Sequence, residues 1–190
     1  FANCQNHGES APTYVYTLDG ERQVLPAQGA LCGMTLDIDG DGYQEVVSTG
    51  YYDMAAPYAS TDIYFGTEDG YCENHHVRIP TPFADDCCYG DFNGKGKPIL
   101  AFVMAHYNCV RLFEKTKLDC YEWDQFVDID LGFKAKLVTA ADLDGDGYDE
   151  LIVRAENVTE TVIYWGGPDG IRTDRKTILP ELPASDILQP

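Results

Sequence analysis

Two short acidic segments of this chain have the residue types and spacing of a metal site. They cover residues 37–45 (DIDGDGYQE) and 142–150 (DLDGDGYDE), with Asp at positions 1, 3 and 5, Gly at 4 and 6, and Glu at 9. Three carboxylates can converge on one point only where the backbone curls, and glycine permits that curl. Carboxylates held so close repel one another without a cation, and oxygen-only ligation favours calcium. The two segments therefore predict two Ca²⁺ sites.

These loops differ from the EF-hand, which begins in a similar way. An EF-hand places its bidentate Glu at loop position 12, where this chain has Ser48 and Val153. The residues that follow the two acidic segments are apolar, and their short runs indicate buried strands rather than exiting helices. Each calcium loop is thus expected to open into a β-strand.

The loops belong to a longer repeat. A third segment in the same frame begins at Asp91, so the three starts at 37, 91 and 142 are about 50 residues apart. Each loop precedes an apolar run and then a second strand that ends in an aromatic residue, at 63–66 (IYFG), 110–113 (VRLF) and 163–166 (IYWG). A period near 50 with about four short strands per unit is typical of β-propeller blades.

The chain resembles the FG-GAP/VCBS repeat family, the blades of integrin-α-type β-propellers, over about residues 12–180. The Asp-rich loops DIDGDGYQE and DLDGDGYDE and the elements IYFG and IYWG carry the resemblance. It implies an all-β fold of about three and a half four-stranded antiparallel blades. The expected segments are an N-terminal segment (1–11), an outer half-blade (12–30), a blade with a calcium loop (31–82), a blade with a degenerate loop (83–133), a second blade with a calcium loop (134–180) and a C-terminal strand segment (181–190).

The resemblance also implies the calcium ligands, which are the side chains at loop positions 1, 3, 5 and 9 and the carbonyl at position 7. Carried over residue by residue, they are Asp37, Asp39, Asp41, Tyr43 and Glu45 in the first loop and Asp142, Asp144, Asp146, Tyr148 and Glu150 in the second.

The middle loop departs from this pattern. It keeps Asp91 and Asn93, but Lys95 replaces the third acid and Ile99 the fourth. We expect the Lys95 ammonium to neutralise Asp91 and this degenerate loop to bind no metal.

Seven cysteines in such a chain indicate an oxidising compartment. Cys109 and Cys120 flank a short turn, so we expect a bridge across a hairpin. Cys32 and one of Cys87 or Cys88 occupy near-equivalent inner-strand positions of successive blades, which favours a bridge between blades. The other disulfide candidates are Cys4 and Cys72, and the odd count leaves one thiol free or joined to another chain.

The composition narrows the possible partners and the location. Lys and Arg number 13 and Asp and Glu 32, so the net charge of −19 disfavours binding to nucleic acid or anionic membranes. The longest uninterrupted apolar run, 99–105, is too short to cross a bilayer, so no membrane insertion is expected. Asn157 begins an acceptor sequon and is a glycosylation candidate. Together with the cysteines and the calcium loops, these features favour a secreted or cell-surface protein.

Three and a half blades do not close a ring, because propellers need about four to eight. The open ends are completed either by other copies of the chain or by the remainder of a longer propeller. We expect a non-enzymatic, calcium-stabilised extracellular module for adhesion or for self-assembly into a ring or filament, with glycans or extracellular proteins as further partners. One alternative is a lectin propeller that binds carbohydrate between blades. The other is a subunit or fragment of a secreted polysaccharide-active enzyme, although no common catalytic motif is present.

Overall fold

In the computed structural model, the regular secondary structure of the described residues is almost all β-strand. The structure describes residues 12–18, 20–26, 30–50, 60–114, 126–156 and 160–179. The elements of these ranges are β1 (Thr13–Tyr16), β2 (Arg22–Leu25), β3 (Ala30–Leu36), β4 (Glu45–Gly50), β5 (Thr61–Tyr64), β6 (His76–Ile79), β7 (Asp86–Gly90), β8 (Ile99–Met104), the 3₁₀ turn η1 (Ala105–Tyr107), β9 (Cys109–Glu114), β10 (Phe126–Asp130), β11 (Ala135–Ala141), β12 (Glu150–Ala155), β13 (Thr161–Tyr164) and β14 (Lys176–Leu179).

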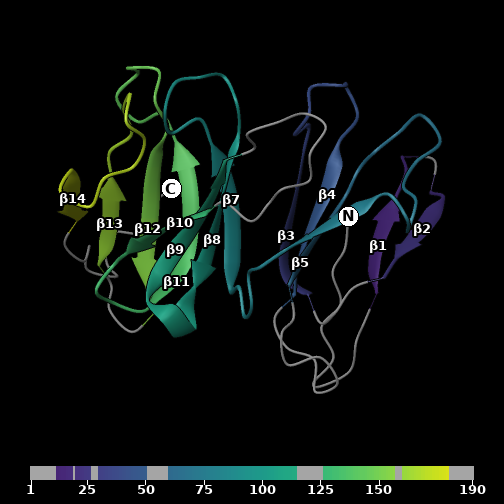
Figure 1. Cartoon of the computed structure of the whole chain (residues 1–190), viewed down its shortest axis with the longest axis horizontal. Helices are drawn as coiled ribbons and strands as arrows, with labels where there is room; N and C mark the ends of the chain where they lie inside the picture. The colour runs from purple at the N-terminus through teal and green to yellow at the C-terminus, as the bar shows by residue number, and fades with distance from the viewer. Residues whose placement is uncertain are drawn as a thin grey trace, which may run out of the picture.

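Within each sheet, strands that are neighbours in sequence pair antiparallel, and the sheets follow one another across the molecule in chain order (Figure 1). The strand orders are β1-β2, β3-β4-β5-β6, β7-β8-β9-β10 and β11-β12-β13-β14. In the described ranges, three four-stranded sheets and one two-stranded sheet form the arrangement expected for three and a half blades. The predicted all-β fold of propeller-type blades is therefore confirmed.

The β7–β10 sheet buries both of its faces because its strands alternate between two cores. In β8, Ile99, Ala101 and Val103 pack toward the β11–β14 sheet. The intervening residues, Leu100, Phe102 and Met104, pack toward the β3–β6 sheet. Successive side chains of a strand point to opposite faces, so a continuous apolar run suits a strand covered on both sides. The blades are therefore stacked layers with a core in each gap.

The two-stranded sheet packs against the first complete blade. Leu25 of β2 joins Val46 and Tyr64 in a small core. The hydroxyls of Thr13 and Ser48 lie 2.9 Å apart, and both residues are buried. Among the described strands β1 pairs only with β2. The half-blade is thus fixed to its neighbour, while one edge of β1 has no partner strand in the described part of the chain.

Candidate calcium centres

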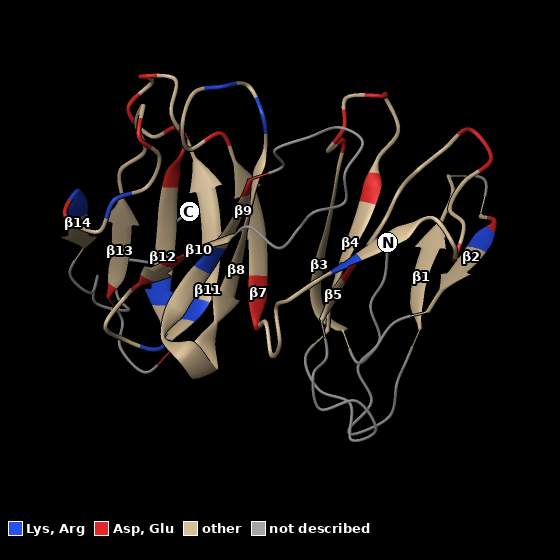
Figure 2. Cartoon of the chain, in the orientation of Figure 1, with Lys and Arg blue, Asp and Glu red and all other residues tan. Residues whose placement is uncertain are grey.

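The three repeat loops join the first and second strands of the complete blades. They lie at the same end of the sheets, and Figure 2 shows acidic residues in the outer two and basic residues in the middle one. The acidic loops connect β3 to β4 and β11 to β12, and the middle loop connects β7 to β8. The repeat thus places an equivalent loop between the first and second strands of each four-stranded sheet.

Each acidic loop brings its three Asp side chains together. In the first loop, carboxylate oxygens of Asp37, Asp39 and Asp41 all lie within 4.8 Å of one another. The loop backbone orients them: Gly40 N–H and Gly42 N–H donate to the two oxygens of Asp37, at 2.6 and 3.0 Å. Both glycines have positive φ, +82° and +92°, which L-residues with a side chain rarely adopt. The predicted curl is therefore what gathers the carboxylates.

The second loop repeats this geometry. Carboxylate oxygens of Asp142, Asp144 and Asp146 also lie within 4.8 Å of one another. Gly145 N–H and Gly147 N–H donate to the two oxygens of Asp142, at 2.7 and 3.1 Å. Three convergent carboxylates form an all-oxygen donor set that suits a hard cation such as calcium. The residues present therefore fit the expected ion in both loops.

The Glu at position 9 of the first loop is held by backbone hydrogen bonds. Glu45 is not part of the group of mutually close carboxylates. It is fully buried, and its Oε2 accepts a hydrogen bond from the Ile38 backbone N–H at 2.5 Å. Its other oxygen accepts from Gly66 N–H at 3.4 Å. The structure thus places this carboxylate beneath the loop, where it ties positions 2 and 9 together, and its role as a ligand stays a prediction.

Glu150 occupies the same place in the second loop. It is 1% exposed and accepts from the Leu143 backbone N–H at 2.6 Å. Burial raises the pKa of both Glu45 and Glu150 above the ordinary value, because a desolvated carboxylate favours its neutral form. Nearby Asp carboxylates raise the pKa further. A bound cation would act in the opposite direction and favour the ionised form.

The glycine of each Phe-Gly element lies against the neighbouring loop backbone. A Cβ added at Gly66 would lie 2.5 Å from the Gln44 carbonyl oxygen, at loop position 8. A Cβ added at Gly166 would lie 2.4 Å from the Asp149 carbonyl oxygen and 2.9 Å from Tyr148 Cβ. These glycines are required for close approach, and the contact explains why the loop and the Phe-Gly element occur together. The sequence shows that the two elements recur at the same spacing, but the contact between them is visible only in the structure.

The degenerate loop keeps the backbone fold without the acids. Lys95 N–H and Gly96 N–H donate to the two oxygens of Asp91 at 3.0 and 2.7 Å. The expected pairing of the Lys95 ammonium with Asp91 is wrong: Lys95 Nζ lies 3.4 Å from Glu114, at the end of β9. The strand register explains this, since Ile99 of β8 pairs with Glu114 and so brings β9 beside the loop.

The degenerate loop is joined to the second acidic loop across the gap between blades. The Asp149 carboxylate accepts from Asp91 N–H at 2.6 Å, and Asp149 N–H donates to the Asp91 carbonyl at 3.2 Å. The Tyr148 ring also packs over Gly94, where an added Cβ would lie 2.6 Å from the ring. The acidic loop at 142–150 is therefore part of the contact between two blades.

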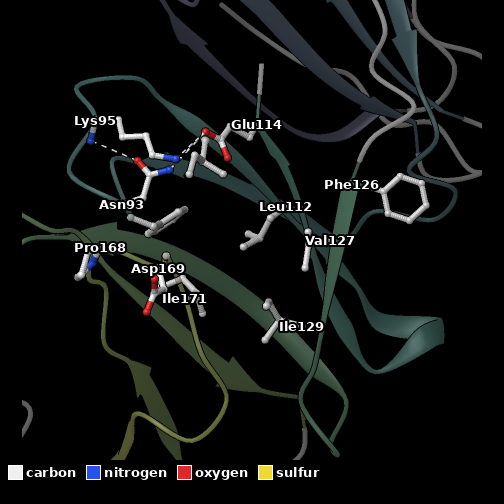
Figure 3. A pocket seen from close by; sticks show the side chains of 13 residues that line it. Asn93, Lys95, Leu112, Glu114, Phe126, Val127, Ile129, Pro168, Asp169 and Ile171 are labelled. Carbon is white, nitrogen blue, oxygen red and sulfur yellow. Dashed lines mark hydrogen bonds and ion pairs between the residues drawn. The ribbon is translucent and has the colours of Figure 1, made fainter. Parts of the chain in front are cut away.

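A cavity of about 500 Å³ lies beside the degenerate loop, between the β7–β10 sheet and the turn at 168–171. Figure 3 shows Asn93, Lys95 and Glu114 joined by polar contacts near one end, and apolar side chains such as Leu112 and Ile129 along the wall. The lining also includes Phe92 and Asp169. The Phe126 ring points away from the cavity and lies against Arg111 (Figure 3). A mostly apolar lining with a few polar groups is typical of a small-molecule site.

The predicted modification sites are only partly within the described residues. Cys32 Sγ lies 3.5 Å from Cys87 Sγ, and Cys109 is buried. Cys88 is half-buried and Cys72 is exposed. Cys4, Cys120, the sequon at Asn157 and the segments 1–11 and 181–190 lie outside the described residues.

A comparison with protein families finds a match within the last blade. Residues 137–169 match the FG-GAP repeat family. This segment begins in β11, contains the acidic loop 142–150 and ends in the turn after the second Phe-Gly element. No curated protein matches the chain. Among the described residues, no helix is long and apolar enough to span a membrane.

Proposed function

Since the chain carries an FG-GAP repeat, as its loops indicated, we propose that it is a calcium-stabilised β-propeller interaction module that acts outside the cell. FG-GAP repeats are typical of extracellular or cell-surface proteins and are generally found in non-enzymatic interaction domains. The observation that carries the proposal is the pair of three-carboxylate clusters, each within 4.8 Å, in equivalent loops of two blades.

Calcium has a structural role in this proposal. Asp37, Asp39 and Asp41 would hold one ion, and Asp142, Asp144 and Asp146 the other. The ion supplies positive charge that offsets the repulsion among the carboxylates. The loop that it stabilises covers Glu45 or Glu150 and packs on the Phe-Gly glycine, so calcium binding supports the strands on either side.

The interaction proposed is completion of the open half-blade. In the complete sheets, the third strand pairs with a second strand: β5 with β4 and β13 with β12. By its sequence, its Asp-Gly turn and its pairing with β2, β1 corresponds to such a third strand, and it has no second strand among the described residues. Exposed strand edges favour pairing with another chain. The partner strands would come from a second copy, which gives a ring or a filament, or from the remainder of a longer propeller.

Analytical ultracentrifugation in calcium and in chelator tests this proposal. We expect the wild-type chain to associate in calcium and to dissociate when calcium is removed. The Tyr16→Lys variant places a charge on β1, where Tyr16 is 53% exposed, and should weaken association at least tenfold, since edge charges oppose strand pairing. Tyr107→Lys is the control, because Tyr107 is similarly exposed (56%) but lies on η1.

Removal of residues 181–190 tests the same contact from the other end. It should abolish association if this segment completes the half-blade of the next copy. A folded wild-type chain that stays strictly monomeric in calcium contradicts self-assembly and favours the longer propeller.

A second candidate function is carbohydrate binding. It is supported by the cavity of about 500 Å³, which lies between two blades and combines apolar side chains with polar groups. A glycan array with the wild-type chain tests it, with Asn93→Ala as the variant that removes a polar group from the wall. A glycan signal that is lost in Asn93→Ala supports the lectin, and no signal at all contradicts it.

A further inference from the structure

Three successive blades meet at one acidic side chain of an inner strand. Asp86, at the start of β7, accepts a hydrogen bond from the Cys32 thiol of β3 at 3.0 Å. Its other oxygen accepts from the Val138 backbone N–H of β11 at 2.9 Å. The carboxylate thus holds β3 and β11 against β7 from its two sides.

Beside this junction, two thiols from different blades are in contact. Cys32 Sγ of β3 lies 3.5 Å from Cys87 Sγ of β7. A disulfide has an S–S length of about 2.0 Å, so the sulfur atoms need to approach by only about 1.5 Å. The pair is therefore close enough to be joined without rearrangement of the sheets.

Alternation along β7 selects Cys87 over its neighbour Cys88. Cys87 belongs to the core shared with the β3–β6 sheet, where Cys32 also packs. Cys88 packs on the opposite face, against the core shared with the β11–β14 sheet. Successive side chains of a strand face opposite ways, so only Cys87 faces β3.

We propose that Cys32 and Cys87 form a disulfide that covalently joins two neighbouring blades, with a small-molecule disulfide such as glutathione disulfide as the oxidant. The Cys32 thiolate attacks one sulfur of glutathione disulfide, and one glutathione thiolate leaves. The Cys87 sulfur then attacks Cys32 Sγ, loses its proton and releases the second glutathione thiolate. The two cysteines together give up two electrons and two protons, and glutathione disulfide is reduced to two thiols.

The surroundings of the two thiols fit this order of events. Cys32 is partly exposed, so a small disulfide can reach it, whereas Cys87 is buried and can act only from inside. The pKa of Cys32 is lowered because the hydrogen bond from Cys87 outweighs the opposite effects of burial and of the Asp86 carboxylate. The same bond raises the pKa of Cys87. The thiolate is the attacking species in thiol–disulfide exchange.

Peptide mapping tests the bond directly. In the Cys72→Ser/Cys88→Ser variant, tryptic peptides 23–78 and 79–95 each contain a single cysteine, Cys32 and Cys87. After treatment of the folded variant with glutathione disulfide, alkylation and digestion, we expect the two peptides to be linked. The same linked pair is expected from the unaltered chain, which covers the case in which the variant fails to fold.

Two results of this mapping overturn the proposal. One is that both peptides are recovered separately and alkylated. The other is that peptide 23–78 carries glutathione on Cys32 without a link to 79–95.

Thermal unfolding tests whether the bond acts on the fold. The bond closes a loop of 55 residues, so oxidation should raise Tm by on the order of 10 °C. Further substitution of Cys87→Ala in this variant should remove the difference between oxidised and reduced protein. Cys109→Ser, which alters another buried thiol of the same core, should leave the difference in place. Equal Tm values before and after the Cys32–Cys87 disulfide forms would contradict a stabilising role of this bond.

Discussion

The contact between the Phe-Gly element and the calcium loop makes Gly166→Ala an informative substitution. The new Cβ would lie 2.4 Å from the Asp149 carbonyl oxygen and 2.9 Å from Tyr148 Cβ, so it meets loop backbone rather than the end of a flexible side chain. Either the loop or β13 must shift. Forcing an added methyl group into a packed site costs about 1–3 kcal/mol, which corresponds to a fall in Tm of about 2–12 °C for a chain of this length.

The same shift moves Tyr148, whose carbonyl is an expected calcium ligand. Calcium titration of Gly166→Ala should therefore show weaker binding at one site and unchanged binding at the other. Gly66→Ala is the matched control, because its Cβ would lie 2.5 Å from the Gln44 carbonyl oxygen of the other loop. Differential scanning calorimetry in calcium and in chelator separates the fall in Tm caused by the added methyl group from the fall caused by weaker calcium binding. Gly166→Ala with wild-type Tm and two wild-type calcium affinities would refute the coupling between the two elements.

Two further predictions concern position 9 of the loops. Glu45→Ala should lower the stability of the calcium-free chain by about 1–3 kcal/mol, because the Ile38 N–H loses its acceptor. Glu45→Gln keeps an amide oxygen and should lower the stability less. Chemical denaturation measures both changes, and equal losses would contradict the role of Glu45 as the acceptor. Burial raises the pKa of Glu45, so the folded calcium-free chain binds the Glu45 proton more tightly than the unfolded chain does. The stability gained from protonated Glu45 should therefore be complete below pH 4.5 and be lost as pH rises through the folded-state pKa. Tm measured against pH in chelator should show this loss in wild type relative to Glu45→Gln, and identical pH profiles would contradict it. The triple change Asn93→Asp, Lys95→Asp and Ile99→Glu should raise the number of calcium ions bound per chain by one, since the degenerate loop already has the backbone fold of the acidic loops. An unchanged number in a folded variant would show that this backbone fold and the added acids do not suffice to bind calcium.

The fold could be predicted from the sequence because its signals are local and repeated. The spacing of Asp37 and Asp142 with their glycines fixes each loop, and the apolar runs that follow fix the strands. The match at 137–169 confirms the predicted FG-GAP resemblance. The clusters of Asp side chains also follow from local geometry, since all members of each lie within one loop.

The parts that were missed depend on contacts between strands. The partner of Lys95 is set by the register that places Glu114 of β9 opposite Ile99 of β8, and loop spacing alone does not give this register. The choice between Cys87 and Cys88 depends on which face of β7 meets β3. The burial of Glu45 had a signal in the sequence, because position 9 comes directly before the apolar residues Val46 and Val47, which predict a buried strand. A carboxylate at the start of such a strand needs backbone donors.

The most direct test of the central claim is the number of calcium ions bound per chain, measured by equilibrium dialysis and elemental analysis. The wild-type chain should bind two ions. The Asp37→Ala/Asp39→Ala and Asp142→Ala/Asp144→Ala variants should each bind one, because each retains a single intact cluster. A folded wild-type chain that binds no calcium at millimolar concentration would contradict the account.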